Sequence, residues 1–292
     1  MRKQPHFLRR FAVTAAVALA LCAGVSAQAA SLVPLGRAVG IQMTTAGMLV
    51  ADLAEVDTPG GKAAPAKDAG LLPGDVICRI DGRDIASSAD FLAAMDAAGD
   101  TLSVTVRRGG TEVTATVTPA VTADGTRQLG LWLRDAVRGL GTVTFYDPAT
   151  GEYGALGHGV GLPETGELMS ASGGEIYRAD VTGVVMGERG TPGELCGGAS
   201  SASPIGSIEE NTVRGIFGTS RTPLGTLPAM PVAAESEIRL GDATILSTVS
   251  TGGVRSYDAV ITRIARSGDG GKLTLTITDG DLLAVTGGIV QG

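Results

Sequence analysis

The sequence predicts a mainly β protein with two successive modules. Its 292 residues are 43% hydrophobic and 18% charged, which is enough apolar material for about two ordinary cores. The 44 glycines and 13 prolines stand among many valines, threonines and isoleucines, and this composition favours short strands joined by tight turns. After residue 127 the pattern changes to short apolar runs broken by glycine. We therefore expect one module at residues 38–120 and a second at residues 127–292.

The first 30 residues are typical of an export signal. An apolar run at residues 11–25 precedes Ala27-Gln28-Ala29, a small-x-small site at which a signal peptidase could cut. The run is shorter than the roughly 20 residues that span a bilayer comfortably, but an uncleaved signal anchor stays open beside a cleaved signal peptide. We expect an exported protein. The basic residues that open the segment are Arg2, Lys3, Arg9 and Arg10.

Charge and cysteine spacing exclude several classes of partner. Without the first 30 residues the chain has 19 basic against 30 acidic residues, a net charge of −11. An acidic surface argues against nucleic acid or anionic lipid as the main partner. Cys78 and Cys196 lack the spacing of metal ligands, so we interpret them as packing residues. No glycine-rich loop has the strand-then-helix frame of a phosphate or dinucleotide site, and we expect neither a metal nor a cofactor.

The most specific pattern of the first module lies at residues 69–85. Pro73-Gly74 predicts a turn, residues 76–80 predict a short buried strand, and Asp81-Gly82 predicts a hairpin turn. Ser87 and Asp90 form a capping box before a helix with one apolar face, and two alternating strands follow across Arg108-Gly109-Gly110. This series resembles the PDZ domain.

A PDZ domain implies that an extended peptide adds to a sheet edge beside the helix. The strand that would receive it is Gly40, Ile41, Gln42 and Met43, with the nearby residues 46–50 as the alternative. The peptide could belong to this chain or to another. The competing interpretation is a rigid spacer whose groove stays empty.

The second module contains His158, the only histidine after the leader. Runs of four to eight β-favouring residues with regular turn signals predict a β-barrel or sandwich here. An unperturbed imidazole titrates near neutral pH, so a hydrolase that moves protons would use this residue. The alternative is that His158, flanked by glycines, only fills a turn.

Several segments of this module resemble the stage IV sporulation protein B peptidases. They include residues 131–135, 139–148, 206–212 and 215–218, together with Gly157-His158, Pro192-Gly193-Glu194 and Thr286-Gly287-Gly288-Ile289-Val290-Gln291-Gly292. These are exported serine endopeptidases of endospore-forming bacteria, with a leader, a PDZ domain and a trypsin-like β-barrel peptidase domain in that order. The resemblance implies cleavage of a regulatory protein between mother cell and forespore, which activates a signalling cascade.

The resemblance also implies catalytic roles. His158 would be the general base, and Asp279 would fix its tautomer. Asp281 and Asp180 are weaker candidates, and Asp279 could instead be a turn residue after a strand.

The nucleophile departs from the family pattern. In the family the last motif runs into Met-Ser-Gly-Ser-Pro, whereas this sequence ends at Gly292, so we expect a barrel incomplete at its C-terminus and little peptidase activity. Residues 197–205, which include Ser200, Ser201 and Ser203, offer a weaker nucleophile loop that precedes Asp279. The alternative function is a non-catalytic exported protein that binds peptides through the PDZ domain.

Overall fold

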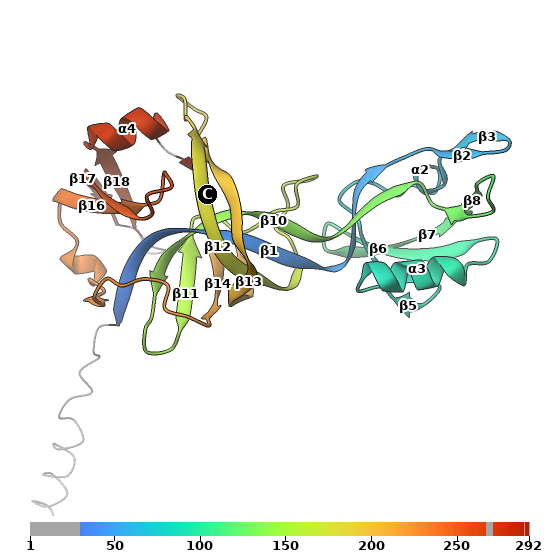
Figure 1. Ribbon diagram of the computed structural model, residues 1–292, viewed down its shortest axis with the longest axis horizontal. Helices are drawn as coiled ribbons and strands as arrows, with labels where there is room; N and C mark the ends of the chain where they lie inside the picture. Colours follow the sequence, from blue (N-terminus) through green and yellow to red (C-terminus); the bar gives the residue numbers. More distant parts are fainter. Residues whose placement is uncertain (1–29, 267–270, 289, 292) are drawn as a thin grey trace, which may run out of the picture.

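The computed structural model describes residues 30–266, 271–288 and 290–291. The predicted leader therefore falls almost entirely outside the described residues. The molecule is mainly β, as predicted, with two modules side by side along its longest axis (Figure 1). In the part of the chain described, no helix is both long enough and apolar enough to cross a bilayer.

Six antiparallel strands of the second module close into a ring. They are β1 (Ser31–Leu53), β10 (Leu131–Tyr146), β11 (Glu152–Leu156), β14 (Gly215–Ser220), β13 (Gly193–Thr212) and β12 (Ala171–Val185). Each pairs with the next in that order, and β12 pairs back to β1. A closed ring leaves no open edge, so the barrel form of the prediction is confirmed.

Glycine lets the barrel strands approach one another closely. A Cβ atom on Gly218 would overlap the carbonyl of Ser207 on the neighbouring strand, and one on Gly36 would overlap the carbonyl of Leu246. The interior is filled by side chains such as Met43, Tyr153 and Ile176, all nearly inaccessible to solvent. The glycines that break the apolar runs in the sequence are therefore packing positions as well as turns.

The first module has its own core and the elements that the sequence predicted. Strands β4 (Val76–Ile80), β6 (Leu102–Arg108) and β7 (Thr111–Val117) form its sheet, with β5 (Arg83–Asp84) on β4 and helices α2 (Pro65–Asp68) and α3 (Ser88–Asp96) beside it. Ser87 caps α3 by accepting a hydrogen bond from the backbone N–H of Asp90. Two short ribbons complete it: β2 (Val56–Thr58) with β3 (Gly61–Ala63), and β8 (Ala120–Val121) with β9 (Arg127–Gln128).

Two long strands are shared by both modules. β1 lies in the barrel up to about Thr45, passes an irregularity at Gly47 and then pairs through Met48 and Leu49 with β4 of the first module. β10 returns beside it from Leu131, so the first module is inserted between two neighbouring barrel strands (Figure 1). The predicted start of the first module at residue 38 thus falls inside a barrel strand.

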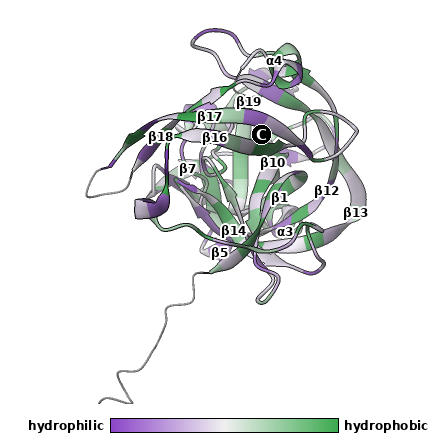
Figure 2. Ribbon diagram, turned by 90° about the vertical axis from the view of Figure 1, so that its left-hand side faces the viewer, coloured by the Kyte–Doolittle hydropathy of each residue, from purple (hydrophilic) through white to green (hydrophobic). Residues whose placement is uncertain are grey.

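The remaining elements form a smaller layer beside the barrel. Strands β16 (Gly241–Ser247), β17 (Arg255–Ala265) and β18 (Lys272–Ile277) make an antiparallel sheet, followed by helix α4 (Gly280–Thr286). β15 (Met230–Pro231) pairs with β1, the 3₁₀ turn η1 (Glu235–Glu237) precedes β16, and β19 (Val290–Gln291) runs parallel to β13. Figure 2 looks onto the end of the molecule that carries this layer, where hydrophobic and hydrophilic segments both occur along the strands and hydrophilic ones also occur on outer loops.

Candidate active site

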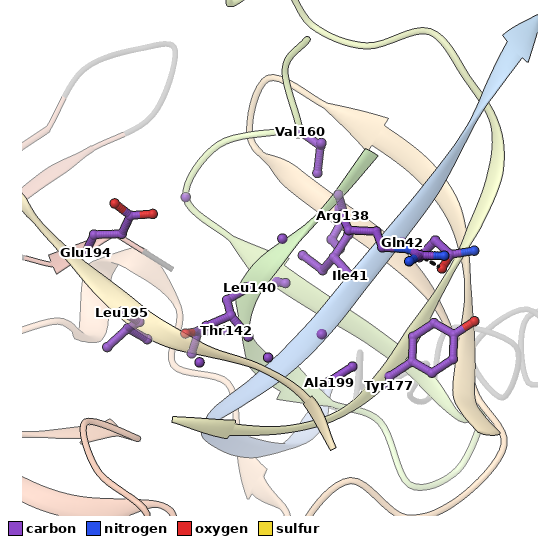
Figure 3. Close-up of a pocket in the computed structure, with 18 of the residues that line it drawn as sticks. Ile41, Gln42, Arg138, Leu140, Thr142, Val160, Tyr177, Glu194, Leu195 and Ala199 are labelled. Atoms are coloured by element: carbon purple, nitrogen blue, oxygen red, sulfur yellow. Dashed lines mark hydrogen bonds between the residues drawn. The ribbon is translucent and has the colours of Figure 1, made fainter. Parts of the chain in front are cut away.

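A cavity of about 1270 Å³ is lined by residues of all six barrel strands and contains His158 in its lining. Its walls come from β1, from β10 between Arg138 and Thr142, from the loop after β11, and from the first half of β13. Glu194 lies at one end, and Arg138, whose Nε donates to Gln42 at 2.8 Å, lies at the other (Figure 3). The cavity therefore offers a carboxylate and a guanidinium at opposite ends of a wall rich in glycine backbone.

His158 follows the end of β11 and is exposed to solvent. Its Nδ1 lies 2.9 Å from the carbonyl oxygen of Gly159. Because a carbonyl oxygen only accepts, Nδ1 must carry the proton in this contact, and Nε2 of the neutral ring keeps its lone pair. That is the tautomer in which Nε2 can take a proton from a nucleophile.

The side chain of Asn211 ties down the backbone after His158. Its Oδ1 accepts from the N–H of Val160 at 2.8 Å, and its Nδ2 donates to the carbonyls of Val160 and Met169, both at 2.9 Å. Gly159 leaves no room for a Cβ, which would overlap the carbonyl of Thr212 and the side chain of Leu168. Nothing in the residue pattern marked Asn211 as functional, because its partners lie 42 and 51 positions away.

Asp279 does not line the cavity that holds His158. It caps α4: Oδ1 accepts from the N–H of Leu282 at 3.0 Å, and Oδ2 accepts from the N–H of Asp258 at 3.4 Å. The Leu282 hydrogen bond, with further backbone donors and the charge of Arg255, lowers the pKa of the Asp279 carboxyl. The carboxylate therefore has the local role that an Asp after a strand often takes, and the hydrogen bond at Nδ1 of His158 goes to a main-chain carbonyl.

The weaker acidic candidates are also absent from the lining of this cavity. Asp180 lies exposed on β12 opposite Gly198, and Asp281 lies exposed in the first turn of α4. Neither residue lines the cavity.

The serine-rich segment shares the cavity with His158. Ser201 and Ala202 belong to its lining, on β13. The hydroxyl of Ser201 donates to the carbonyl of Ser203 at 3.0 Å and accepts from the N–H of Ser203 at 3.1 Å. Ser201 is therefore in a local turn-like arrangement, within the same cavity as the imidazole but not hydrogen-bonded to it.

The predicted peptide-binding strand is already paired along both edges. Gly40, Ile41, Gln42 and Met43 pair with residues 137–140 of β10 on one side and with residues 174–177 of β12 on the other. A peptide adds to a free strand edge, whereas in this arrangement both edges of these four residues are occupied by the protein's own strands. Three of them still line the cavity, whereas Met43 is buried in the barrel core.

The alternative strand at residues 46–50 is also paired along both edges. Within residues 46–50, Met48 and Leu49 pair with β4, while Leu49 and Val50 pair with β10. Both edges are again taken by the protein's own sheet.

The loop between β11 and β12 links this site to the first module. Glu164 in this loop is largely buried and lies 3.8 Å from Arg134 on β10, and its Oε2 has no hydrogen-bond partner among the described residues. Thr165 packs so closely on Gly74 that a Cβ there would overlap its methyl group. One end of the loop therefore carries His158 and its middle contacts the predicted turn of the first module.

The remaining polar side chains of the site do not form a metal centre. Within the described ranges no three His, Cys, Asp or Glu residues gather closely enough to hold a metal ion. Cys78 and Cys196 are unpaired; Cys78 packs on the barrel core, and Cys196 lines the cavity.

Comparisons with known proteins agree with this arrangement of modules. A PDZ domain model matches residues 38–118, and a family model described as SpoIVB peptidase S55 matches residues 125–292. The chain is also 42% identical over 55 residues to the serine protease HTRA1 of Xenopus tropicalis. That match covers 19% of this chain and spans only 12% of the length of the relative. Since the S55 model covers more than half of the sequence, the chain belongs to the SpoIVB peptidase S55 family, as its motifs predicted.

Proposed function

We propose that this protein acts as an exported serine endopeptidase that cleaves a regulatory protein during endospore formation and thereby activates a signalling cascade. The observation that carries the proposal is His158, whose Nδ1 lies 2.9 Å from the Gly159 carbonyl oxygen on the wall of a large cavity within an S55 peptidase domain. Such an imidazole takes the proton of a nucleophilic hydroxyl and returns it to the leaving amine.

The shape of the cavity suits an extended peptide. Gly139, Gly141, Gly197 and Gly198 line it and bring main-chain groups close to any occupant. Glu194 and Arg138 give the two ends opposite charge, so a substrate segment with basic and acidic residues at opposite ends would be favoured. We therefore propose that the substrate carries the complementary charges, with a basic residue near Glu194 and an acidic residue near Arg138.

The nucleophile has two candidate sources. The family resemblance places it after Gly292, and the weaker candidate within the described residues is Ser201. The test therefore expresses the protein from its native gene, including any codons that follow that for Gly292. A fluorophosphonate probe, which reacts with activated serines, is then mapped by mass spectrometry.

Labelling is expected in the wild type and is expected to be lost in His158→Ala. His6→Gln is the matched control, because it removes the other histidine of the chain from the predicted leader. A label on Ser201 would assign the nucleophile to β13, and a label beyond residue 292 would assign it to the family motif. Equal labelling of wild type and His158→Ala would contradict the proposal.

The alternative function is a non-catalytic exported protein that binds peptides through its PDZ domain. It is favoured by Asp279, whose Oδ1 caps α4 and whose Oδ2 accepts from the N–H of Asp258, so that neither oxygen meets His158. A native gene product that takes up no label yet binds peptides in a display library would support this alternative.

Export and anchoring form a separate part of the proposal, since they depend on the first 30 residues. We place the protein outside the cytoplasm, in the space between mother cell and forespore, with a protein substrate and a PDZ ligand in cis or in trans. N-terminal sequencing of the protein from sporulating cells separates the two fates: a start at about residue 30 means cleavage, and a start near Met1 in the membrane fraction means an anchor.

A further inference from the structure

The imidazole of His158 depends on its own backbone for orientation. Its Nδ1 partner is the carbonyl of the next residue, Gly159, at 2.9 Å. Because His158 is exposed, surrounding side chains do not enclose the ring. The position of the peptide between Gly159 and Val160 therefore sets the position of the Gly159 carbonyl oxygen, which is the acceptor that favours a proton on Nδ1 of His158.

That peptide is held by one side chain. Asn211 accepts from the N–H of Val160, which belongs to the same peptide unit as the Gly159 carbonyl. Its amide nitrogen donates to the carbonyls of Val160 and Met169 and so joins the beginning of the β11–β12 loop to its end. An amide is the side chain that can do both, since it combines an acceptor oxygen with two N–H donors.

The packing around Gly159 supports the same assignment. A Cβ atom at this position would come 2.7 Å from Oδ1 of Asn211 and would also overlap the Thr212 carbonyl. The backbone of the His158 segment therefore lies directly on the strand that carries Asn211. A shift of this strand would move the Gly159 carbonyl with it.

We propose that Asn211 is a positioning residue for His158. It holds the Gly159 carbonyl where that oxygen accepts from Nδ1–H, and this leaves Nε2 as the proton acceptor. The inference rests on the proposed function for its catalytic meaning, but the tautomer itself can be measured without activity.

The test is ¹⁵N NMR of the imidazole in the untagged full chain carrying His6→Gln, so that His158 is the only histidine observed. At a pH above the imidazole pKa, we expect the protonated-nitrogen signal at Nδ1 in this background. In His6→Gln/Asn211→Ala it should move largely to Nε2, the nitrogen that a free imidazole in water prefers to protonate. Glu210→Gln is the matched control, because Glu210 is the exposed neighbour of Asn211 and should leave the signal at Nδ1.

Asn211→Leu keeps roughly the side-chain volume but removes the acceptor as well as both donors, and it serves if Asn211→Ala does not fold. A folded Asn211 variant that keeps Nδ1–H would overturn the proposal, and so would a parent spectrum with the proton on Nε2. If the native gene product is active, kcat should fall roughly tenfold or more in Asn211→Ala with KM little changed, since a wrong tautomer is costly in serine peptidases. An inactive parent with the expected NMR result would count against the proposed function alone.

Discussion

The two modules hold their cores together by different means. The PDZ module has a core of side chains that come from its own strands and helices. An ion pair also joins its turn to its sheet, since Asp75 accepts from Arg108 at 2.6 and 2.7 Å. The barrel instead joins β1 to strands about 100 and 135 residues further along the chain and has glycines where backbones lie in close contact. We therefore expect the loss of a contact in the first module to act locally, whereas the barrel should depend on close backbone packing around its cavity.

The largest effect should come from filling a backbone contact in the barrel. Gly218→Ala places a methyl group against the carbonyl of Ser207, and we expect a loss of about 3 kcal/mol or more in the free energy of unfolding. Hydrogen exchange followed by mass spectrometry should show faster exchange in the barrel strands than in β4 and β6. Gly183→Ala on β12 is the control, because a Cβ there meets nothing within 4 Å. Equal effects of the two variants would show that the close backbone contact at Gly218 does not set the stability of the barrel.

The next effect should be confined to the PDZ module. Asp75 is buried and accepts from Nε and Nη2 of Arg108 and from the N–H of Leu72, so Asp75→Ala leaves three donors without this acceptor. We expect a loss of about 2–3 kcal/mol, reduced because the partly exposed Arg108 regains water. Urea titration measures the total, and hydrogen exchange should place the change in β4 and β6. Asp96→Ala, at the exposed end of α3, should change little; exchange that rises mainly in the barrel would contradict the prediction.

A smaller effect should follow from a buried hydroxyl of the barrel. Tyr153 donates to the carbonyl of Ser207 at 3.0 Å, and Tyr153→Phe should cost about 1 kcal/mol at neutral pH. Burial, with the charge of Glu209, raises the pKa of the Tyr153 phenol. The neutral phenol therefore stabilises the fold fully below the unfolded pKa of about 10, and this contribution is lost as pH rises above that value.

The alkaline arm of the stability curve checks this sign. Wild type should lose stability more steeply than Tyr153→Phe above about pH 10, and Tyr177→Phe, whose hydroxyl reaches Glu175 near the surface, serves as the neutral-pH control. Parallel curves for wild type and Tyr153→Phe would show that the buried phenol does not contribute.

The smallest effect should come from the cap of α4, outside both cores. Since the pKa of Asp279 is lowered in the folded state, its contribution is present above the unfolded pKa of about 3.9 and is lost as pH falls through the lower folded value. Asp279→Asn should therefore flatten the acid arm of the stability curve slightly, whereas Asp281→Asn should not. Acid unfolding followed by circular dichroism measures both variants. An unchanged curve for Asp279→Asn would show that the charged cap of α4 does not contribute to the acid stability of the protein.

Local chemistry explains what the sequence could predict. The turn at Pro73-Gly74, the Ser87 cap and the hairpin at Gly109-Gly110 depend on residues within a few positions of one another, and all appear as expected. The mainly β fold and the family were likewise within reach of patterns and motifs.

Long-range pairing explains what the sequence could not predict. The sequence around Gly40 predicts a strand with a free edge for a peptide. In the structure, β10 and β12, about 100 and 135 residues further along the chain, pair with both of its edges. The role of Asn211 could not be predicted for the same reason, because its hydrogen-bond partners lie 42 and 51 positions away in the sequence. Asp279 illustrates a competition: its motif position predicts a catalytic acid, while its place before α4 satisfies backbone donors, and the local role is the one adopted here.

The insertion of the PDZ module between β1 and β10 has a mechanical consequence. A pull that separates the two modules acts along both strands, in the direction of the chain, rather than across their hydrogen bonds. Both strands are then loaded in the same direction, so the hydrogen bonds that resist are those that join β1 to β12 and β10 to β11 within the barrel, and these are loaded in shear. Tension on the first module would therefore be transmitted directly to the barrel strands that border the cavity of His158.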